Sequence, residues 1–169
     1  FRRSRGLGDV YKRQVRRCQV LIVGAGPGGY VAGIRSGQLG LDTIVVEGDK
    51  AGGTCLIRGC IPSKAMIHAA ERFESISMHS SEKGHMGISI DSPPQLNMAS
   101  LVSWKDSIVD RLNKGVESLL KGSGVELIKG WAKFTGPKRC IVSSKDGDVE
   151  IEAELSLIHI SEPTRPPEI

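Results

Sequence analysis

Two cysteines, Cys55 and Cys60, form a Cys-x-x-x-x-Cys pattern within the stretch 52–64, and Lys64 follows about one helical turn later. Such a pair can be two buried thiols, a structural disulfide or a redox pair. The short loop gives a disulfide little stability through chain entropy, and a cytosolic compartment disfavours structural disulfides. A helix N-terminus would lower the thiol pKa and favour the thiolate that performs exchange. The spacing alone leaves the three possibilities open.

A glycine-rich turn lies upstream of the cysteines, between two short apolar runs. Residues 18–23 are apolar and rich in β-branched side chains, which predicts a buried parallel strand. The GAGPGG sequence at 24–29 matches G-x-G-x-x-G, and a helical pattern follows over 28–39. Residues 43–47 predict a second buried strand that ends in an acid. Strand, glycines, helix, strand and acid therefore occur in the order typical of a dinucleotide site.

Each residue type in that order has a physical reason. Gly24 permits a tight turn, Gly26 lets the backbone approach a pyrophosphate, and Gly29 lets the helix pack against the strand. The helix N-terminus offers unpaired N–H groups and partial positive charge to phosphates. Glu47 is expected to accept hydrogen bonds from ribose hydroxyls. Because Cys55 follows Glu47 so closely, a redox role is favoured for the cysteine pair.

The rest of the chain predicts an α/β fold. We expect a Rossmann-type FAD-binding domain with a parallel sheet and a small antiparallel β-meander. Pro62 is expected to distort the first turn of the helix that carries the cysteines. The remaining predicted elements are helices over 64–73 and 100–121, a parallel strand over 125–128, and meander strands over 130–134, 139–142 and 149–153.

The two ends of the chain differ in character from the middle. One choice of codons for residues 4–14 gives a DNA whose reverse complement translates to residues 155–165, residue for residue. That DNA resembles a transposase adapter used to prepare sequencing libraries. We therefore predict that residues 1–14 and 155–169 are translated adapter, and that the functional domain is 15–154.

This division changes what the charge implies. Lys and Arg total 23 and Asp and Glu total 19; without the six basic and three acidic residues of the ends, 17 and 16 remain, a net charge of +1. A nearly neutral domain does not favour nucleic-acid binding. The sequence shows no apolar run of membrane-spanning length and no signal peptide, so we expect a cytoplasmic protein, or one of an organelle matrix. Cys18 and Cys140 are expected to be buried thiols, and no metal site is expected.

Residues 18–153 resemble the FAD-binding domain of the flavoprotein disulfide reductases, and within that family the dihydrolipoamide dehydrogenases most. The resemblance rests on GAGPGG at 24–29, VVE at 45–47 and GGTCLIRGCIPSKAMIH at 52–68. Glutathione and mercuric reductases are similar, but usually have valine where Ile61 stands.

The resemblance implies a set of site roles. Cys55 would exchange with dihydrolipoamide or a lipoyl protein, and Cys60 would lie against the flavin as a charge-transfer thiolate. Lys64 would stabilise the reduced flavin, and electrons would pass from dithiol to disulfide to FAD to NAD⁺. The residues implied in FAD binding are Gly24, Gly26, Pro27, Gly28, Gly29, Glu47, Gly48, Gly53, Thr54, Lys64 and Ala132. The segment 130–132, which ends at Ala132, would contact the adenine through its backbone.

The resemblance further implies a longer, homodimeric protein whose NAD, central and interface domains follow residue 154. Its general base, a His–Glu pair, would come from the interface domain, so this fragment alone is expected not to turn over dihydrolipoamide. The alternatives are a glutathione or mercuric reductase-like enzyme and a non-catalytic flavin-binding module. Ile57-Arg58 stands where Asn-Val is common in the family, and Arg58 is expected to stabilise a nearby thiolate.

Overall fold

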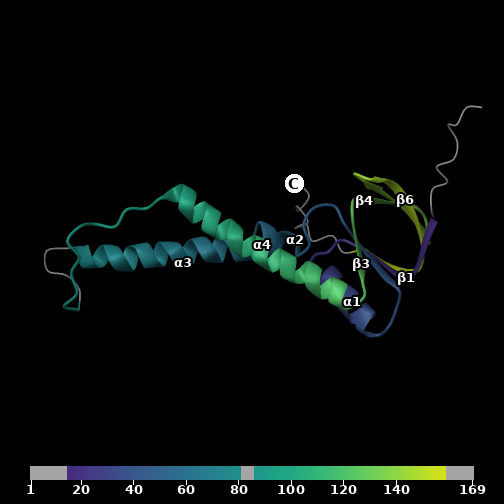
Figure 1. Ribbon diagram of the computed structural model, residues 1–169, viewed down its shortest axis with the longest axis horizontal. Helices are drawn as coiled ribbons and strands as arrows, with labels where there is room; N and C mark the ends of the chain where they lie inside the picture. The colour runs from purple at the N-terminus through teal and green to yellow at the C-terminus, as the bar shows by residue number, and fades with distance from the viewer. Residues whose placement is uncertain (1–14, 81–85, 159–169) are drawn as a thin grey trace, which may run out of the picture. The chain divides into compact units, whose positions relative to one another are not determined.

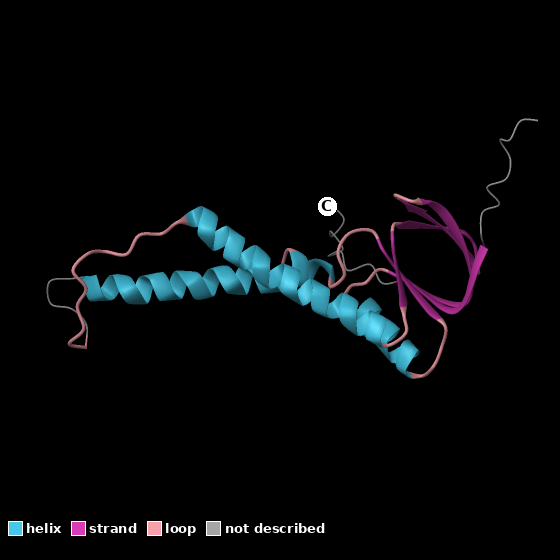
Figure 2. Ribbon diagram, viewed as in Figure 1, coloured by secondary structure: helices cyan, strands magenta, loops and turns pink. Residues whose placement is uncertain are grey.

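The structure is a computed structural model that describes residues 15–80 and 86–158. These residues form two compact units. Residues 15–51 and 119–158 make up the first, which we call the sheet unit, and 52–80 and 86–118 make up the second, the helical unit. All the strands belong to the sheet unit, whereas the two longest helices lie wholly or mostly in the helical unit (Figures 1 and 2).

The sheet unit contains one six-stranded sheet in the order β3-β2-β1-β6-β5-β4. The strands β3, β2, β1 and β6 run parallel to their neighbours, and β6, β5 and β4 form an antiparallel meander. The predicted α/β fold, with a parallel sheet and a small meander, is therefore confirmed. Its elements are β1 (Val15–Val23), α1 (Pro27–Gln38), β2 (Thr43–Glu47), β3 (Glu126–Lys129), β4 (Trp131–Gly136), β5 (Arg139–Ser144) and β6 (Gly147–Ile158).

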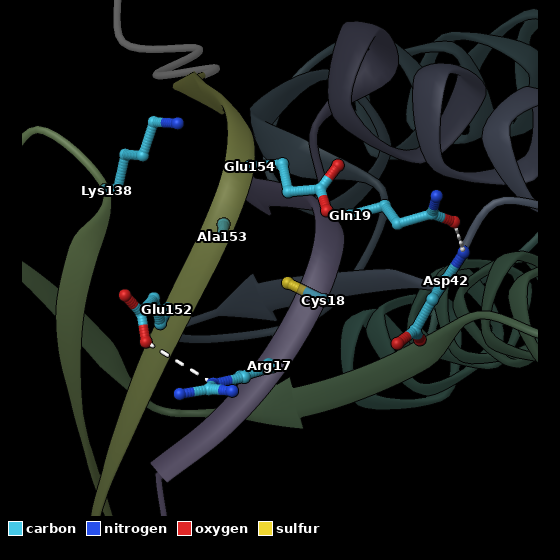
Figure 3. Close-up of a pocket in the computed structure, with 8 residues that line it drawn as sticks. All are labelled: Arg17, Cys18, Gln19, Asp42, Lys138, Glu152, Ala153 and Glu154. Atoms are coloured by element: carbon cyan, nitrogen blue, oxygen red, sulfur yellow. Dashed lines mark hydrogen bonds and ion pairs between the residues drawn. The ribbon is translucent and has the colours of Figure 1, made fainter.

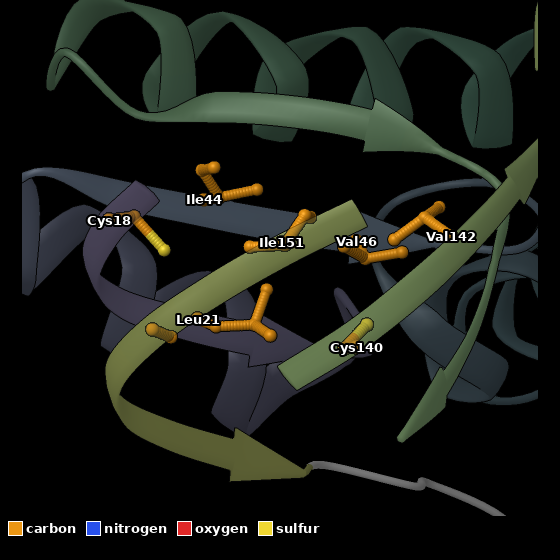
Figure 4. Packing of buried hydrophobic residues seen from close by; sticks show 8 residues of the cluster. Cys18, Leu21, Ile44, Val46, Cys140, Val142 and Ile151 are labelled. Atoms are coloured by element: carbon orange, nitrogen blue, oxygen red, sulfur yellow. The ribbon is translucent and has the colours of Figure 1, made fainter. Parts of the chain in front are cut away.

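The strand β2 is buried on both faces, which explains its unbroken apolar sequence. On one face, Ile44 and Val46 pack in the main core cluster with Val142 of β5 and Ile151 of β6 (Figure 4). On the other face, Val45 lies against α1, whose backbone approaches it at Gly33. Because β2 and β5 are not neighbours in the sheet yet share a core, the sheet must curl to bring the meander over the parallel strands.

The strand β6 is longer than the sequence predicted. Its first half pairs antiparallel with β5, and it continues parallel to β1, so that 155–158 lie opposite 20–23. The predicted domain limit at Glu154 therefore falls inside this strand, and Leu155 and Leu157 are exposed. Residues 1–14 and 159–169, which include most of the predicted adapter segments, lie outside the described residues. The adapter origin of the two ends stays a prediction.

The helical unit is built from two long helices and two short ones. They are α2 (Gly53–Ile57), α3 (Cys60–Ser77), η1 (Met78–Ser80) and α4 (Met98–Gly122), whose last residues belong to the sheet unit. Pro62, Met66 and Ile67 of α3 line a cavity of about 470 Å³ together with Val102 of α4. Among the described helices, none combines the length and the hydropathy that crossing a bilayer requires.

Candidate dinucleotide and disulfide site

The glycine turn connects β1 to α1 at the carboxyl end of the parallel strands. Gly24 adopts a φ of +97° and donates its N–H to the carbonyl of Val46 at 2.8 Å. A Cβ at Gly29 would lie 1.8 Å from the carbonyl oxygen of Gly24, so no other residue fits there without moving the backbone. The helix α1 begins at Pro27 with Gly26 as its N-cap, and no acid stands in its first turn. The first turn of α1 therefore presents N–H groups without an acidic side chain of its own.

Glu47, the last residue of β2, is held at this turn by both carboxylate oxygens. Its Oε2 accepts the N–H of Ala25 at 2.7 Å, and its Oε1 accepts the N–H of Asp49 at 3.0 Å. Its backbone carbonyl accepts the N–H of Gly130 at 2.9 Å. The predicted ribose-binding acid and the predicted phosphate-binding turn are therefore neighbours in space.

The donors at the turn and the acid beside it fit the adenosine half of a dinucleotide. A pyrophosphate needs backbone N–H groups, and the N-terminus of α1, capped by Gly26, supplies them. A ribose needs an acceptor one sugar away from the phosphates, which matches the place of Glu47. The arrangement fits the adenosine half of FAD on this chemistry alone.

The helical unit holds the predicted disulfide. Cys55 lies in α2 and Cys60 is the first residue of α3, and the two are joined by a disulfide with a Cα–Cα distance of 4.8 Å. Cys60 is exposed and Cys55 is half-buried. Neither cysteine is fully buried, so a thiolate can approach the disulfide, as exchange requires.

The chain reverses between the cysteines because α2 stops abruptly. The N–H groups of Arg58 and Gly59 both donate to the carbonyl of Thr54, at 2.9 and 2.7 Å. A Cβ at Gly59 would lie 3.1 Å from that carbonyl oxygen and 3.3 Å from the Cα of Cys55. Glycine at this position therefore allows the next helix to start beside Cys55.

The prediction that Pro62 distorts the first turn of α3 is wrong, because the interruption has another cause. Pro62 is the third residue of α3, where a backbone N–H has no partner within the helix, so its missing N–H costs no hydrogen bond. The first helical bond found here runs from the N–H of Ser63 to the carbonyl of Gly59 at 3.0 Å. The interruption lies one step earlier, at Arg58 and Gly59, and α3 begins as a regular helix.

The predicted site residues fall into two groups. The sheet unit brings together the glycine turn, Glu47, Gly48 and, on β4, Ala132. The helical unit contains Gly53, Thr54 and the cysteine pair, with Lys64 exposed on the second turn of α3.

The sequence prediction for the segment 130–132 concerned its backbone and did not include the side chain of Trp131, the first residue of β4. A Cβ at Gly48 would lie 2.9–3.0 Å from three carbon atoms of its indole, so the ring lies against the backbone just after Glu47. Trp131, Gly48 and Gly130 line a cavity of about 690 Å³. The sequence shows an aromatic residue directly before Ala132. It does not show that this residue contacts Gly48, which lies far away along the chain.

The two other cysteines are buried, as expected. Cys18 lines a cavity of about 380 Å³ in the sheet unit, where Arg17 faces Glu152 at 3.5 Å and Gln19 accepts the N–H of Asp42 (Figure 3). Burial raises the pKa of Cys18 to about 11, and the negative charge of Asp42 contributes in the same direction. Burial also raises the pKa of Cys140. Both thiols are therefore poor candidates for exchange at neutral pH.

The sequence of this chain is similar to a known protein family and to curated relatives. Residues 18–156 match the family described as "Pyridine nucleotide-disulphide oxidoreductase". Dihydrolipoyl dehydrogenase of Pseudomonas aeruginosa is 48% identical over 146 residues, covering 86% of this chain and 31% of that protein. Dihydrolipoyl dehydrogenase of Halobacterium salinarum is 46% identical over 151 residues, covering 89% of this chain and 31% of that protein. The chain thus spans about a third of the length of these relatives.

A solved structure has a similar fold. The Cu(II) complex of the HOCl-induced flavoprotein disulfide reductase RclA from Escherichia coli matches with a TM-score of 0.71. The match is 22% identical in sequence and covers 90% of this chain and 31% of that one. At this identity the likeness concerns the fold.

Proposed function

This chain belongs to the pyridine nucleotide-disulphide oxidoreductase family, and we propose that it is the FAD-binding and disulfide-bearing part of a dihydrolipoyl dehydrogenase. The whole enzyme would oxidise dihydrolipoamide to lipoamide and reduce NAD⁺. Members of this family depend on FAD. The proposal is supported chiefly by the Cys55–Cys60 disulfide at the junction of α2 and α3, in a chain that also has a glycine turn with the acid Glu47 beside it.

The cysteine pair would accept two electrons from the substrate dithiol. One substrate thiolate attacks the sulfur of Cys55, the Cys55–Cys60 bond breaks, and Cys60 leaves as a thiolate. The second substrate thiolate then attacks the substrate sulfur bound to Cys55, which closes the substrate disulfide and releases Cys55 as a thiolate. The substrate loses two electrons and two protons, and the cysteine pair gains the two electrons. The protons pass to a base that we assign to no residue of this chain.

The residues that would hold FAD follow from the fit described above. The glycine turn at 24–29 would bind the pyrophosphate, with Glu47 and Gly48 on the adenosine side and the backbone of Ala132 near the adenine. Gly53, Thr54 and Lys64 are our candidates for the flavin half. When bound, FAD supplies the two-electron chemistry that links a dithiol to NAD⁺. A homodimer, a lipoyl-protein substrate and a cytoplasmic location are predictions for the whole protein.

The test is a thiol count on the purified chain. We expect dihydrolipoamide to reduce the disulfide, so that an alkylating agent then labels Cys55 and Cys60 but not Cys18 or Cys140. Reduced glutathione at the same thiol concentration should be slower, because the relatives are lipoyl enzymes. A faster reaction with glutathione would favour the glutathione reductase-like alternative.

A second measurement addresses the flavin. The chain loaded with FAD should gain a long-wavelength absorbance when the disulfide is reduced, from the Cys60 thiolate against the flavin. The variant Cys60→Ser should lose this band, and Cys140→Ser, which changes a buried thiol elsewhere, should keep it. A chain that binds FAD but whose disulfide resists every dithiol would be a non-catalytic flavin-binding module.

A further inference from the structure

Arg58 lies between the two cysteines of the disulfide, at the end of α2. Its N–H donates to the carbonyl of Thr54 at 2.9 Å, which is the α-helical bond between residues four apart. Arg58 therefore still occupies a helical position, three residues after Cys55. Residues three apart in a helix are neighbours, with about 5–6 Å between their Cβ atoms. The side chain of Arg58 thus starts next to Cys55, and it is exposed.

The start of α3 is positive as well. Cys60 is the first residue of this 18-residue helix, which has no side-chain cap and no acid in its first turn. The helix N-terminus therefore carries partial positive charge at Cys60. Over residues 52–70 the sequence contains Arg58 and Lys64, and no Asp or Glu. The chain around the disulfide thus supplies positive charge and no acid of its own.

Positive charge at this place favours an anionic group on the attacking dithiol. A substrate whose thiolate attacks the disulfide brings the rest of its molecule close to the cysteines. A carboxylate on a short aliphatic chain would then come within reach of the long Arg58 side chain, whose guanidinium can bind a carboxylate with two parallel hydrogen bonds. A neutral amide at the same place gains no such charge attraction. Two dithiols that differ in this group alone should therefore react at different rates.

We propose that Arg58 is a specificity-determining residue that favours dithiols carrying a carboxylate near their sulfur atoms. The inference rests on the proposed function, since it assumes that the Cys55–Cys60 disulfide exchanges with a dithiol. It differs from the expected stabilisation of a thiolate by Arg58, because that effect acts on the protein's own sulfur. Thiolate stabilisation changes the rates with all dithiols by one factor, whereas substrate selection changes the ratio between charged and neutral dithiols.

The experiment compares dihydrolipoate, which carries a carboxylate, with dihydrolipoamide, which carries a neutral amide in its place. Each dithiol is added to the full chain, and timed alkylation with mass spectrometry measures how fast the disulfide is reduced. The readout is the ratio of the rate with dihydrolipoate to the rate with dihydrolipoamide. In Arg58→Gln this ratio should fall about threefold at about 0.1 M salt, as for two charges about 4 Å apart in water with moderate screening. Arg58→Lys, which keeps the charge, should restore most of it.

Arg72→Gln is the matched control. Arg72 is an exposed arginine of α3, and at about 1.5 Å per residue it lies about 18 Å along the helix from Cys60. This distance exceeds the Debye length of about 10 Å at 0.1 M salt, so the ratio should stay that of the unmodified chain. Salt gives a test without any variant. At about 1 M the Debye length is about 3 Å, so the ratio in the unmodified chain should approach that of Arg58→Gln.

The outcomes separate this inference from the proposed function. If both dithiols reduce the disulfide and Arg58→Gln leaves the ratio unchanged, Arg58 does not select substrates, while the proposed function stands. If Arg58→Gln slows both dithiols by the same factor, Arg58 acts on the cysteine thiolate or on the local fold, which also overturns the inference. If neither dithiol reduces the disulfide of the unmodified chain, the proposed function and this inference fail together.

Discussion

The Oε2 atom of Glu47 accepts a hydrogen bond of 2.7 Å from the backbone N–H of Ala25, which ties the end of β2 to the turn that follows β1. The bond fixes the carboxylate beside the residues expected to bind phosphate. The N–H of Asp49 donates to the other oxygen at 3.0 Å, so both oxygens have a backbone partner. The acid is thereby oriented by the protein itself, and a ligand would not have to order it.

Substituting Glu47→Gln should weaken dinucleotide binding. The amide oxygen can still accept one backbone N–H, but the amide nitrogen cannot accept the other, and the charge is lost. Hydrogen bonds to charged groups contribute about 1.5–3 kcal/mol, so we expect FAD and ADP to bind at least tenfold more weakly. Calorimetry on the purified chain measures this.

The matched control for that prediction is Glu154→Gln, an exposed carboxylate of the same type on β6. It should leave both affinities unchanged. Equal losses in the two variants would show that net charge, and not the position of Glu47, determines binding.

Substituting Gly29→Ala should destabilise the sheet unit strongly. The new Cβ would meet the carbonyl oxygen of Gly24 at 1.8 Å, so backbone must move on one side or the other. We expect a loss of about 3 kcal/mol or more in the free energy of unfolding, as for other severe steric changes. Urea denaturation measures the loss.

Gly115→Ala is the matched control, because a Cβ at that position meets nothing within 4 Å. Gly115 lies inside α4, where alanine is favoured over glycine by about 1 kcal/mol. The same mutation type should therefore stabilise one site and destabilise the other. A Gly29→Ala variant as stable as the unmodified chain would contradict the close approach of the helix and the turn.

The sequence predicted the glycine turn, the helix after it and the strand that ends at Glu47, because the requirements of these elements are local. Glycines, a following helix and a terminal acid each act within a few residues, and β2 reads as apolar because both of its faces are covered. The Cys-x-x-x-x-Cys spacing alone left three possibilities open. Its closeness to Glu47 and the family resemblance favoured a redox disulfide, and the structure contains the Cys55–Cys60 disulfide.

Features that depend on distant contacts were not predictable. The length of β6 depends on its pairing with β1, and the place of Trp131 depends on a contact with Gly48. The break between α2 and α3 was assigned to Pro62, since proline is the obvious helix breaker in the sequence. Its cause is Gly59, whose role appears only when the distance to Thr54 and Cys55 is known.

The four cysteines should differ sharply in reactivity. After mild reduction, we expect a thiol reagent to label Cys60 and Cys55 quickly and the buried Cys18 and Cys140 slowly. The raised pKa of Cys18, about 11 against an ordinary 9.0, alone lowers its thiolate fraction about a hundredfold. Mass spectrometry of timed alkylation identifies the labelled residues. Early labelling of Cys18 in the folded chain would contradict its burial.

Cys18 should also make the stability of the chain depend on alkaline pH. Its pKa is raised in the folded state, so folding favours the protonated thiol. The contribution of Cys18 to the free energy of unfolding is complete below about pH 9, where the thiol is protonated in both the folded and the unfolded chain. It is lost as the pH rises from about 9 to about 11, because the unfolded chain ionises first. Because the pKa of Cys18 is raised from 9.0 to about 11, the free energy of unfolding at pH 11 should be about 2 kcal/mol lower than below pH 9.

The comparison of the unmodified chain with Cys18→Ala isolates this effect, since lysines and tyrosines titrate in both. The difference in unfolding free energy between them should shrink as the pH rises from 8 to 11. In the variant Asp42→Asn the decline should be smaller, because the nearby negative charge that helps to raise the Cys18 pKa is gone. If the unmodified chain and Cys18→Ala lose stability in parallel across this range, the thiol is not held in its protonated form by the fold.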